Sequence, residues 1–234
     1  MSTHSPLHRR ARGRAKPSPF RISALSPQLT PALPNSYVSP RHRAQKTLEL
    51  LNVGCADPYP WQDTSDNNNI ALIPSPHKTD ARVTVTDRIA EWDYGDYEGI
   101  TSAEIRKLRT DQGLGPWDIW RDGCPGGESP EQIISRVDSL IAEIREKYHK
   151  PVIGKPKQPG VTGDVMVVGH GHILRAFAIR WVEKPLTETA LIMEAGGVGT
   201  LSYEHHNIDE PAILLGGGFV VGEDKEETKQ AGNS

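Results

Sequence analysis

The run Val165-Met-Val-Val-Gly-His-Gly-His172 decides the fold, because it joins an apolar strand to a turn of small residues. Four consecutive apolar residues predict a strand that is buried on both faces, as in a parallel sheet flanked by helices. The strand ends at Gly169-His170-Gly171, and a helix with Leu174, Phe177 and Trp181 on its apolar side follows. This order is typical of α/β proteins, which bind ligands at the carboxyl ends of their strands.

Four further signals place elements before this strand in the sequence. A Val/Thr alternation predicts a strand over 83–86. A capping box that begins at Thr101 predicts a helix over 101–112. Ser129-Pro130 begins a long helix with an apolar stripe at helical spacing. Ser39-Pro40 predicts the start of a shorter helix, with the serine as N-cap and the proline at the first helical position.

Two polar loops and two short strands complete the order of elements. Residues 55–80 are rich in Pro, Asn and Asp, and residues 116–127 in Trp and Gly, so both are expected to be surface loops. The segments 191–194 and 199–204 predict two more strands. Strands that alternate with helices predict an α/β fold, a three-layer sandwich in which helices flank a mostly parallel central sheet.

The ends of the chain differ in composition from its middle. Residues 1–36 contain five arginines, one lysine and six prolines but no Asp or Glu, and they show no apolar periodicity. Such a segment buries too little surface to offset its ordering entropy. We therefore expect a disordered segment over 1–36, one domain over 37–222 and a flexible tail over 223–234. A transit peptide is the alternative for the N-terminus, although its prolines would interrupt the amphipathic helix of such peptides.

Bulk properties exclude several classes of protein. The net charge of −3 favours neither a nucleic acid nor an anionic membrane as the main partner. No stretch of the sequence approaches the roughly 20 consecutive apolar residues of a membrane helix. Two cysteines make no disulfide framework, which favours a reducing compartment, and we expect a cytoplasmic protein. His205-His206 has no accompanying ligand spacing in the sequence, so no metal site is predicted there.

Three groups of residues can do chemistry, and each has a simpler alternative. His170 lies between glycines at a strand end, where it either faces a ligand or packs against the protein. Arg41 and Arg43 near a helix start either bind an anion or form a solvated basic face. The segment 91–99 interleaves four carboxylates with three aromatic residues, and partial burial can raise the pKa of one of its acids.

Together these segments resemble the histidine phosphatase superfamily, whose fold is phosphoglycerate mutase-like. Ser39-Pro-Arg-His-Arg-Ala-Gln-Lys-Thr47 is similar to the motif whose arginine before alanine binds phosphate, which falls on Arg43. Glu91 matches the glutamate that donates a proton to the leaving oxygen. His170 matches the histidine that contacts the transferred phosphoryl group, with Gly171 as a further phosphate-binding position.

Two longer stretches, 117–129 and 196–211, resemble the sedoheptulose-bisphosphatase-like branch of fungi, and the likeness runs from about 37 to 221. The resemblance implies hydrolysis of a small sugar phosphate through a phosphohistidine, with arginines and the second histidine holding the phosphoryl oxygens and no metal or other cofactor. The residues implied as substrate-binding are Trp117, Arg121, Glu128, Ser129 and Arg175. The alternative for the loop that contains Trp117 and Arg121 is a lid that packs against the protein.

One departure from the superfamily is severe. Its attacking histidine lies in an Arg-His-Gly motif on a first, central strand, and this sequence contains no Arg-His-Gly. His8 and His42 have the wrong neighbours, so the nucleophile is unknown. We therefore expect a sheet that lacks its first strand, at a cost of several kcal/mol against a total stability of about 5–15 kcal/mol. A truncated or misassembled gene product would explain the departure.

Three functions follow from these observations. The first is a sugar bisphosphatase whose catalysis is impaired in this chain. The second is activity on other phosphate esters with an unrecognised nucleophile or direct attack by water. The third is a non-catalytic or regulatory protein in which Arg43 and His170 hold a phosphate without turnover.

Overall fold

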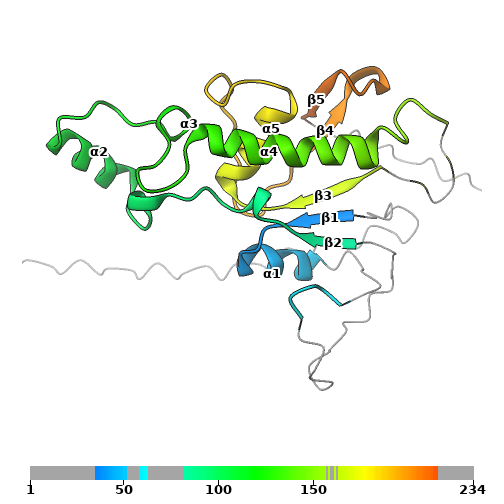
Figure 1. The fold of residues 1–234 in the computed structure, drawn as a ribbon, viewed down its shortest axis with the longest axis horizontal. Coiled ribbons are helices and arrows are strands. Elements are labelled where there is room, and N and C mark those ends of the chain that lie inside the picture. The colour runs from blue at the N-terminus through cyan, green and yellow to red at the C-terminus, as the bar shows by residue number, and fades with distance from the viewer. Residues whose placement is uncertain are drawn as a thin grey trace, which may run out of the picture. The chain divides into compact units, whose positions relative to one another are not determined.

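The computed structural model describes residues 35–51, 58–62, 82–156, 158, 161 and 163–215. The predictions of a disordered segment before residue 35 and of a flexible tail after residue 222 lie outside these residues. Most of the loop predicted over 55–80 lies outside them too. Everything below concerns the described part of the domain (Figure 1).

The central sheet has three parallel strands in the order β2–β1–β3. Strand β1 (Asn35–Val38) pairs on one side with β2 (Arg82–Val85) and on the other with β3 (Val165–Val168). The pairing is in register from Asn35 to Val38, so all three carboxyl ends meet at one edge of the sheet. The strands predicted over 83–86 and 165–168 are confirmed.

Helices cover both faces of this sheet (Figure 1). Helix α1 (His42–Leu51) packs on one face, where Ala44 and Leu48 form a buried cluster with Val38 and Val168. Helices α4 (Pro130–Ile144) and α5 (Gly171–Trp181) pack against each other and, with Tyr37 of β1, form the larger core on the opposite face. Successive strand residues therefore serve opposite layers, and the predicted three-layer α/β sandwich is confirmed.

The predicted caps are present at two helices. Helix α2 (Ser102–Asp111) begins after a capping box between Thr101 and Glu104, and α4 begins after one between Ser129 and Gln132. The loop predicted over 116–127 contains one short helix, α3 (Ile119–Asp122), which Asp118 caps at its N-terminus. Single turns complete the chain at η1 (Asp87–Ile89), η2 (Gly95–Tyr97), the π-turn η3 (Arg145–His149) and η4 (Glu204–His206).

A second, antiparallel sheet contains only β4 (Thr200–Tyr203) and β5 (Pro211–Leu214). The first of these strands confirms the prediction over 199–204, while the second was not predicted. The strand predicted over 191–194 is wrong, because those residues have no strand partner and Ile192 is 87% exposed. Among the described strands, β3 pairs only with β1.

The segment around Ser39 also differs from its prediction. Strand β1 begins at Asn35, two residues before the expected start of order at Tyr37, and α1 begins at His42 rather than at Pro40. Ser39 is not a helix cap, because its backbone N–H extends the sheet by donating to the Val168 carbonyl oxygen at 3.0 Å. Its hydroxyl accepts from the Arg41 N–H at 3.2 Å and so turns the chain before the helix.

Among the described residues, the structure contains no helix that is both long enough and apolar enough to span a membrane.

Candidate functional site

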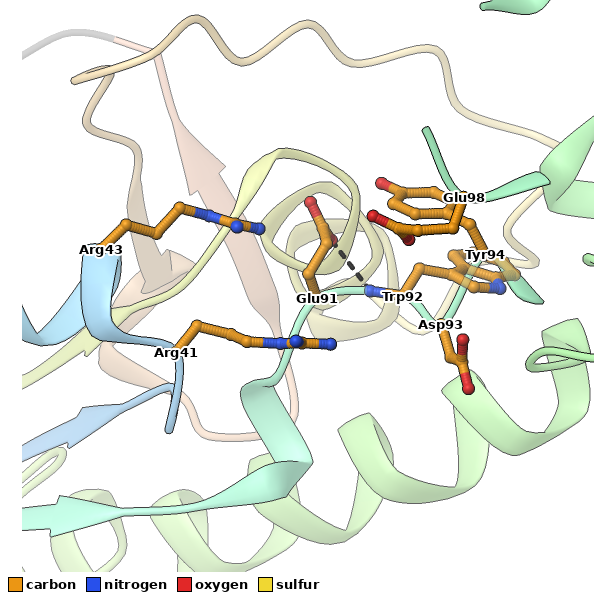
Figure 2. A pocket seen from close by; sticks show the side chains of 7 residues that line it. All are labelled: Arg41, Arg43, Glu91, Trp92, Asp93, Tyr94 and Glu98. Atoms are coloured by element: carbon orange, nitrogen blue, oxygen red, sulfur yellow. Dashed lines mark hydrogen bonds between the residues drawn. The ribbon is translucent and has the colours of Figure 1, made fainter. Parts of the chain in front are cut away.

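A pocket of about 250 Å³ opens beside the carboxyl ends of the three parallel strands (Figure 2). Arg41 and Arg43 line one side, and they follow β1 in the sequence. The segment 91–94, which follows β2 through η1, lines the other side together with Glu98. This location agrees with the general rule that parallel α/β sheets bind ligands beyond the carboxyl ends of their strands.

His170 lies directly behind Arg43 and joins the ends of β3 and β1. Its Nδ1 accepts from Arg43 Nε at 2.8 Å, and its Nε2 lies 2.8 Å from the buried Ser39 hydroxyl. A ring that accepts at Nδ1 carries its proton at Nε2, so Nε2 donates to the hydroxyl. Burial, and then the charge of Arg43, lower the pKa of His170, which keeps the ring neutral near pH 7.

The two arginines supply positive charge without protein counterions. Neither Arg41 nor Arg43 forms an ion pair with a carboxylate of the described residues. Figure 2 shows both side chains extended in the direction of Glu91 and the segment that follows it. The hydrogen bond to His170 fixes Arg43 through Nε and leaves its terminal nitrogens to bind another group. Two adjacent guanidinium groups of this kind are suited to a phosphate.

Glu91 occupies the N-terminus of α5. One carboxylate oxygen accepts from the Ile173 N–H and the Trp92 N–H, each at 3.0 Å, and the other lies 3.4 Å from the His172 N–H. A negative charge is favoured there by the helix dipole and by the free amides of the first turn. Glu91 therefore holds helix α5 in place as well as lining the pocket.

The backbone N–H of Gly171, by contrast, has no acceptor among the described residues. Gly171 is exposed, and a Cβ built on it would meet no atom within 4 Å. An anion can therefore approach this amide from open space, beside the side chain of Arg43 that reaches His170. The sequence-predicted phosphate residues Arg43, His170 and Gly171 are thus neighbours around one corner of the site.

Tyr94 and His172 form the wall that follows Glu91. The Tyr94 hydroxyl lies 2.8 Å from His172 Nδ1. Burial, followed by the charge of Glu91, raises the pKa of Tyr94, so the phenol stays protonated. Burial is also the largest cause that lowers the pKa of His172. Both groups are therefore neutral near pH 7 and present a polar but uncharged surface.

Arg136 of α4 anchors the segment that carries Glu91. Its guanidinium forms a bidentate pair with Glu128, at 2.8 and 2.9 Å, and both side chains are largely buried. The same group donates to the carbonyl oxygens of Asp87, Arg88 and Ala90 at 2.9–3.2 Å. One largely buried side chain thus ties three carbonyls of the segment before Glu91, together with Glu128, to the long helix.

The residues that the sequence suggested for substrate binding lie around the pocket rather than in its lining. Trp117 packs edge to face on Tyr97, with ring centroids 5.2 Å apart, and Arg121 forms two 2.8 Å bonds to Asp122. Glu128 is engaged by Arg136, and Ser129 caps α4. Arg175 differs from these, because its guanidinium stacks on Trp120 at 4.8 Å and has no carboxylate partner among the described residues.

Sequence reasoning missed three residues of the site. Ser39 was interpreted as a helix cap, yet it holds the ring of His170. His172 was part of the quoted motif, but nothing in the sequence linked it to Tyr94. Arg136 left no signal beyond its place on the polar side of an apolar stripe. The bonds of Ser39 to His170, of His172 to Tyr94 and of Arg136 to the three carbonyls join positions 46 to 131 residues apart, which no local pattern encodes.

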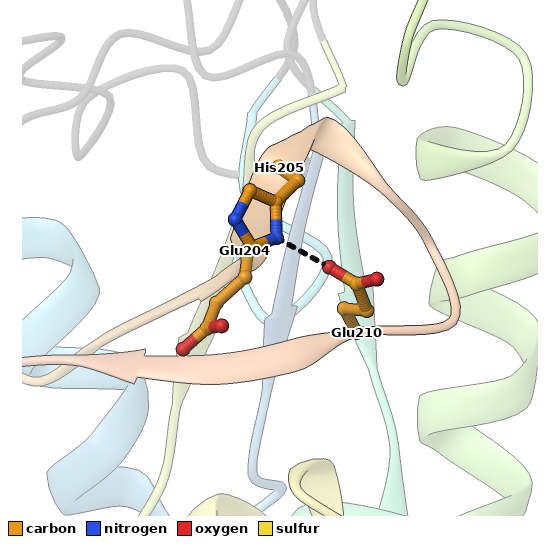
Figure 3. Close-up of side chains that lie close together, drawn as sticks. All are labelled: Glu204, His205 and Glu210. Carbon is orange, nitrogen blue, oxygen red and sulfur yellow. Dashed lines mark hydrogen bonds and ion pairs between the residues drawn. The ribbon is translucent and has the colours of Figure 1, made fainter.

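The hairpin between β4 and β5 gathers a separate set of polar groups (Figure 3). Glu204, His205 and Glu210 offer ligand atoms within 4.8 Å of one another, although the sequence showed no such spacing. His205 Nδ1 lies 2.7 Å from a Glu210 oxygen, and this hydrogen bond raises the pKa of the histidine. All three side chains are exposed, and exposed acidic groups of this kind are common without an ion.

The parallel sheet, the paired arginines and the strand-end histidine define an α/β protein with a positively charged pocket, and the sequence comparison identifies its class. The chain belongs to the histidine phosphatase superfamily (branch 1), whose profile matches residues 71–210. The family relationship predicted from the motifs is therefore confirmed, and it places the chain among the phosphoric monoester hydrolases.

Individual relatives agree with this class. The chain is 34% identical to sedoheptulose 1,7-bisphosphatase from Saccharomyces cerevisiae over 226 residues, which cover 81% of this chain and 75% of that protein. It is 38% identical to an acid phosphatase from Mycobacterium tuberculosis over 131 residues, or 56% of either chain. The solved structure of the open reading frame Rv3214 product from M. tuberculosis matches with a TM-score of 0.54 at 30% identity, covering 78% of this chain and 70% of that one.

Proposed function

We propose that this protein binds sugar phosphates of the sedoheptulose 1,7-bisphosphate type, and that its family chemistry is hydrolysis of the phosphate ester through a phosphohistidine. The observation that carries the proposal is the pair Arg41 and Arg43 on one side of a pocket, with His170 behind them. Two cations without a carboxylate partner among the described residues hold the phosphoryl oxygens, and the neutral histidine fixes Arg43 in position.

We further propose that hydrolysis is impaired in this chain. The sequence contains no Arg-His-Gly, the motif that carries the attacking histidine in the superfamily. His170 is not a substitute as it stands, since both of its ring nitrogens already have partners in Arg43 and Ser39. His172 has Tyr94 on its Nδ1. A phosphoryl acceptor needs a ring nitrogen that is free to attack.

The test combines turnover with binding. Phosphate release from sedoheptulose 1,7-bisphosphate by the purified chain is expected to be very slow, whereas inorganic phosphate is expected to raise the melting temperature. Arg43→Ala should abolish that rise, and His206→Ala, at an exposed position on the hairpin, should not. Turnover that His170→Ala removes would contradict the impairment but support the phosphatase activity. No effect of phosphate on the unsubstituted chain would overturn the whole proposal.

A non-catalytic phosphate-binding protein is the second candidate function. It is favoured by the hydrogen bonds that occupy both ring nitrogens of His170. It is also favoured by Glu91, whose carboxylate accepts from two backbone amides of α5. The two candidates differ when a segment with Arg-His-Gly is supplied ahead of Asn35. An impaired phosphatase should then regain turnover and form an acid-labile phosphohistidine, whereas a dedicated binding protein should show neither.

A further inference from the structure

Arg175 is an unusual arginine in this domain. It lies on α5, one turn beyond His172, and its Nε is buried without a hydrogen-bond partner. Most arginines around it are neutralised, for example Arg136 by Glu128 and Arg180 by Asp138. Arg175 has no ion pair with any carboxylate of the described residues, and its guanidinium lies over the face of Trp120, 4.8 Å from the ring centroid. An unpaired guanidinium that is partly withdrawn from water favours an anionic partner.

Trp120 connects this guanidinium to the pocket. Its ring centroid lies 5.6 Å from that of Trp92, which lines the pocket. It also lies 5.6 Å from the ring centroid of His172, whose Nδ1 is hydrogen-bonded to the pocket residue Tyr94. The cation is therefore connected through Trp120 to the side of the pocket that Trp92 and Tyr94 line. Stacking on an indole fixes the plane of the guanidinium, so that its terminal nitrogens stay available to an oxyanion.

We propose that Arg175, seated on Trp120, is the subsite for the second phosphate of a sugar bisphosphate. The inference rests on the proposed function, because it assumes that the first phosphate binds at Arg43 and His170. The inference also distinguishes the two arginines that the resemblance implies as substrate-binding. Arg121 is already bonded twice to Asp122, whereas Arg175 has no carboxylate partner among the described residues. A protein with this subsite prefers bisphosphates to the corresponding monophosphates.

The test measures binding, so it does not depend on turnover. Titration calorimetry would compare sedoheptulose 1,7-bisphosphate, sedoheptulose 7-phosphate and inorganic phosphate on the full chain. The variant Arg175→Met removes the charge but keeps an apolar stem against Trp120. We expect it to lose the preference for the bisphosphate, about tenfold or more, with unchanged affinity for inorganic phosphate. Arg106→Met, at an exposed arginine of α2, is the matched control and should behave as the unsubstituted chain.

Each other outcome has a definite meaning. A bisphosphate preference that persists in Arg175→Met would overturn the inference and leave the proposed function intact. An equal loss for all three ligands would also overturn it, because Arg175 would then act on the first site. Failure of the unsubstituted chain to bind inorganic phosphate would overturn the proposed function and the inference with it. Arg175→Lys should keep the melting temperature and part of the preference, since it restores the charge without the planar fork.

Discussion

At the scale of single residues, Glu91 shows how a proposed catalytic residue can also be structural. The family resemblance gives it the role of proton donor, whereas its contacts make it the N-terminal cap of α5. The carboxylate faces the pocket and two amides of the helix at once. A Glu91 variant can therefore lose activity either because the proton donor is absent or because helix α5 has lost its cap. A stability measurement separates these two causes.

Glu91→Gln should lower the free energy of unfolding by about 1–2 kcal/mol, because it removes a negative charge from a helix N-terminus and offers an amide where N–H donors converge. Urea denaturation measures this change. Glu98→Gln, at another carboxylate of the pocket, has no hydrogen bond to break among the described residues and should change stability by less than about 0.5 kcal/mol. Equal stability of the two variants would show that Glu91 is not a structural cap.

Gly171 gives the opposite combination, a proposed phosphate contact at a position where a side chain has no structural cost. Gly171→Ala should keep or raise stability by up to about 1 kcal/mol, because alanine favours the helix and its Cβ meets no atom. The same Cβ stands beside the amide that an anion approaches, so affinity for inorganic phosphate should fall about tenfold. Calorimetry and thermal denaturation on one sample test both parts. Unchanged affinity would remove the Gly171 amide from the phosphate site.

At the scale of elements, the segment between β2 and α2 contains no regular helix or strand except single turns, yet it carries half of the pocket. Its geometry depends on Arg136, which binds the carbonyl oxygens of three residues in the segment and the carboxylate of Glu128. The segment is therefore positioned by α4 rather than by its own local structure.

Arg136→Met should destabilise the protein by about 3 kcal/mol, because it leaves the buried Glu128 carboxylate and three carbonyls without their donor. Lys107→Met breaks an exposed i,i+4 pair with Asp111 and should cost no more than about 0.5 kcal/mol. Chemical denaturation compares the two. If both variants lost an equally small amount of stability, the bidentate pair between Arg136 and Glu128 would not anchor the segment.

Prediction from sequence also succeeded or failed by element. Helices α2 and α4 were predicted correctly because their caps lie within four residues of the signal. Strand β1 was not predicted, and its first two residues were assigned to the disordered segment, because Asn-Ser-Tyr-Val has only one β-branched residue and its stability comes from partners 47 and 130 residues away. Arg43 and His170 were found through their motifs, but the hydrogen bond between them joins two strand ends, which is information that only the sheet supplies.

At the scale of the whole molecule, the sheet separates two clusters of buried side chains, and the site lies beyond them at the carboxyl ends of the strands. Among the described residues, three histidines are buried or partly buried: His149 packs edge to face on Trp181 and bonds to Tyr203, while His170 and His172 belong to the site. For all three, burial is the largest cause of a lowered pKa. The domain thus folds around neutral imidazoles, which makes its stability depend on pH.

The sign of that dependence follows from proton binding. Unfolded histidines take up a proton at about pH 6.5, whereas these three do so only at lower pH when folded, so the unfolded state binds more protons in between. Stability should therefore be greatest above pH 6.5 and fall as the pH drops from there towards 5. Urea denaturation at pH 7.5, 6.5 and 5.5 measures the fall. His172→Gln should make it shallower, since one buried imidazole is gone. His205→Gln should not, because this exposed histidine has a raised pKa and contributes with the opposite sign. A fall as steep in His172→Gln as in the unsubstituted chain would mean that His172 is charged in the folded protein.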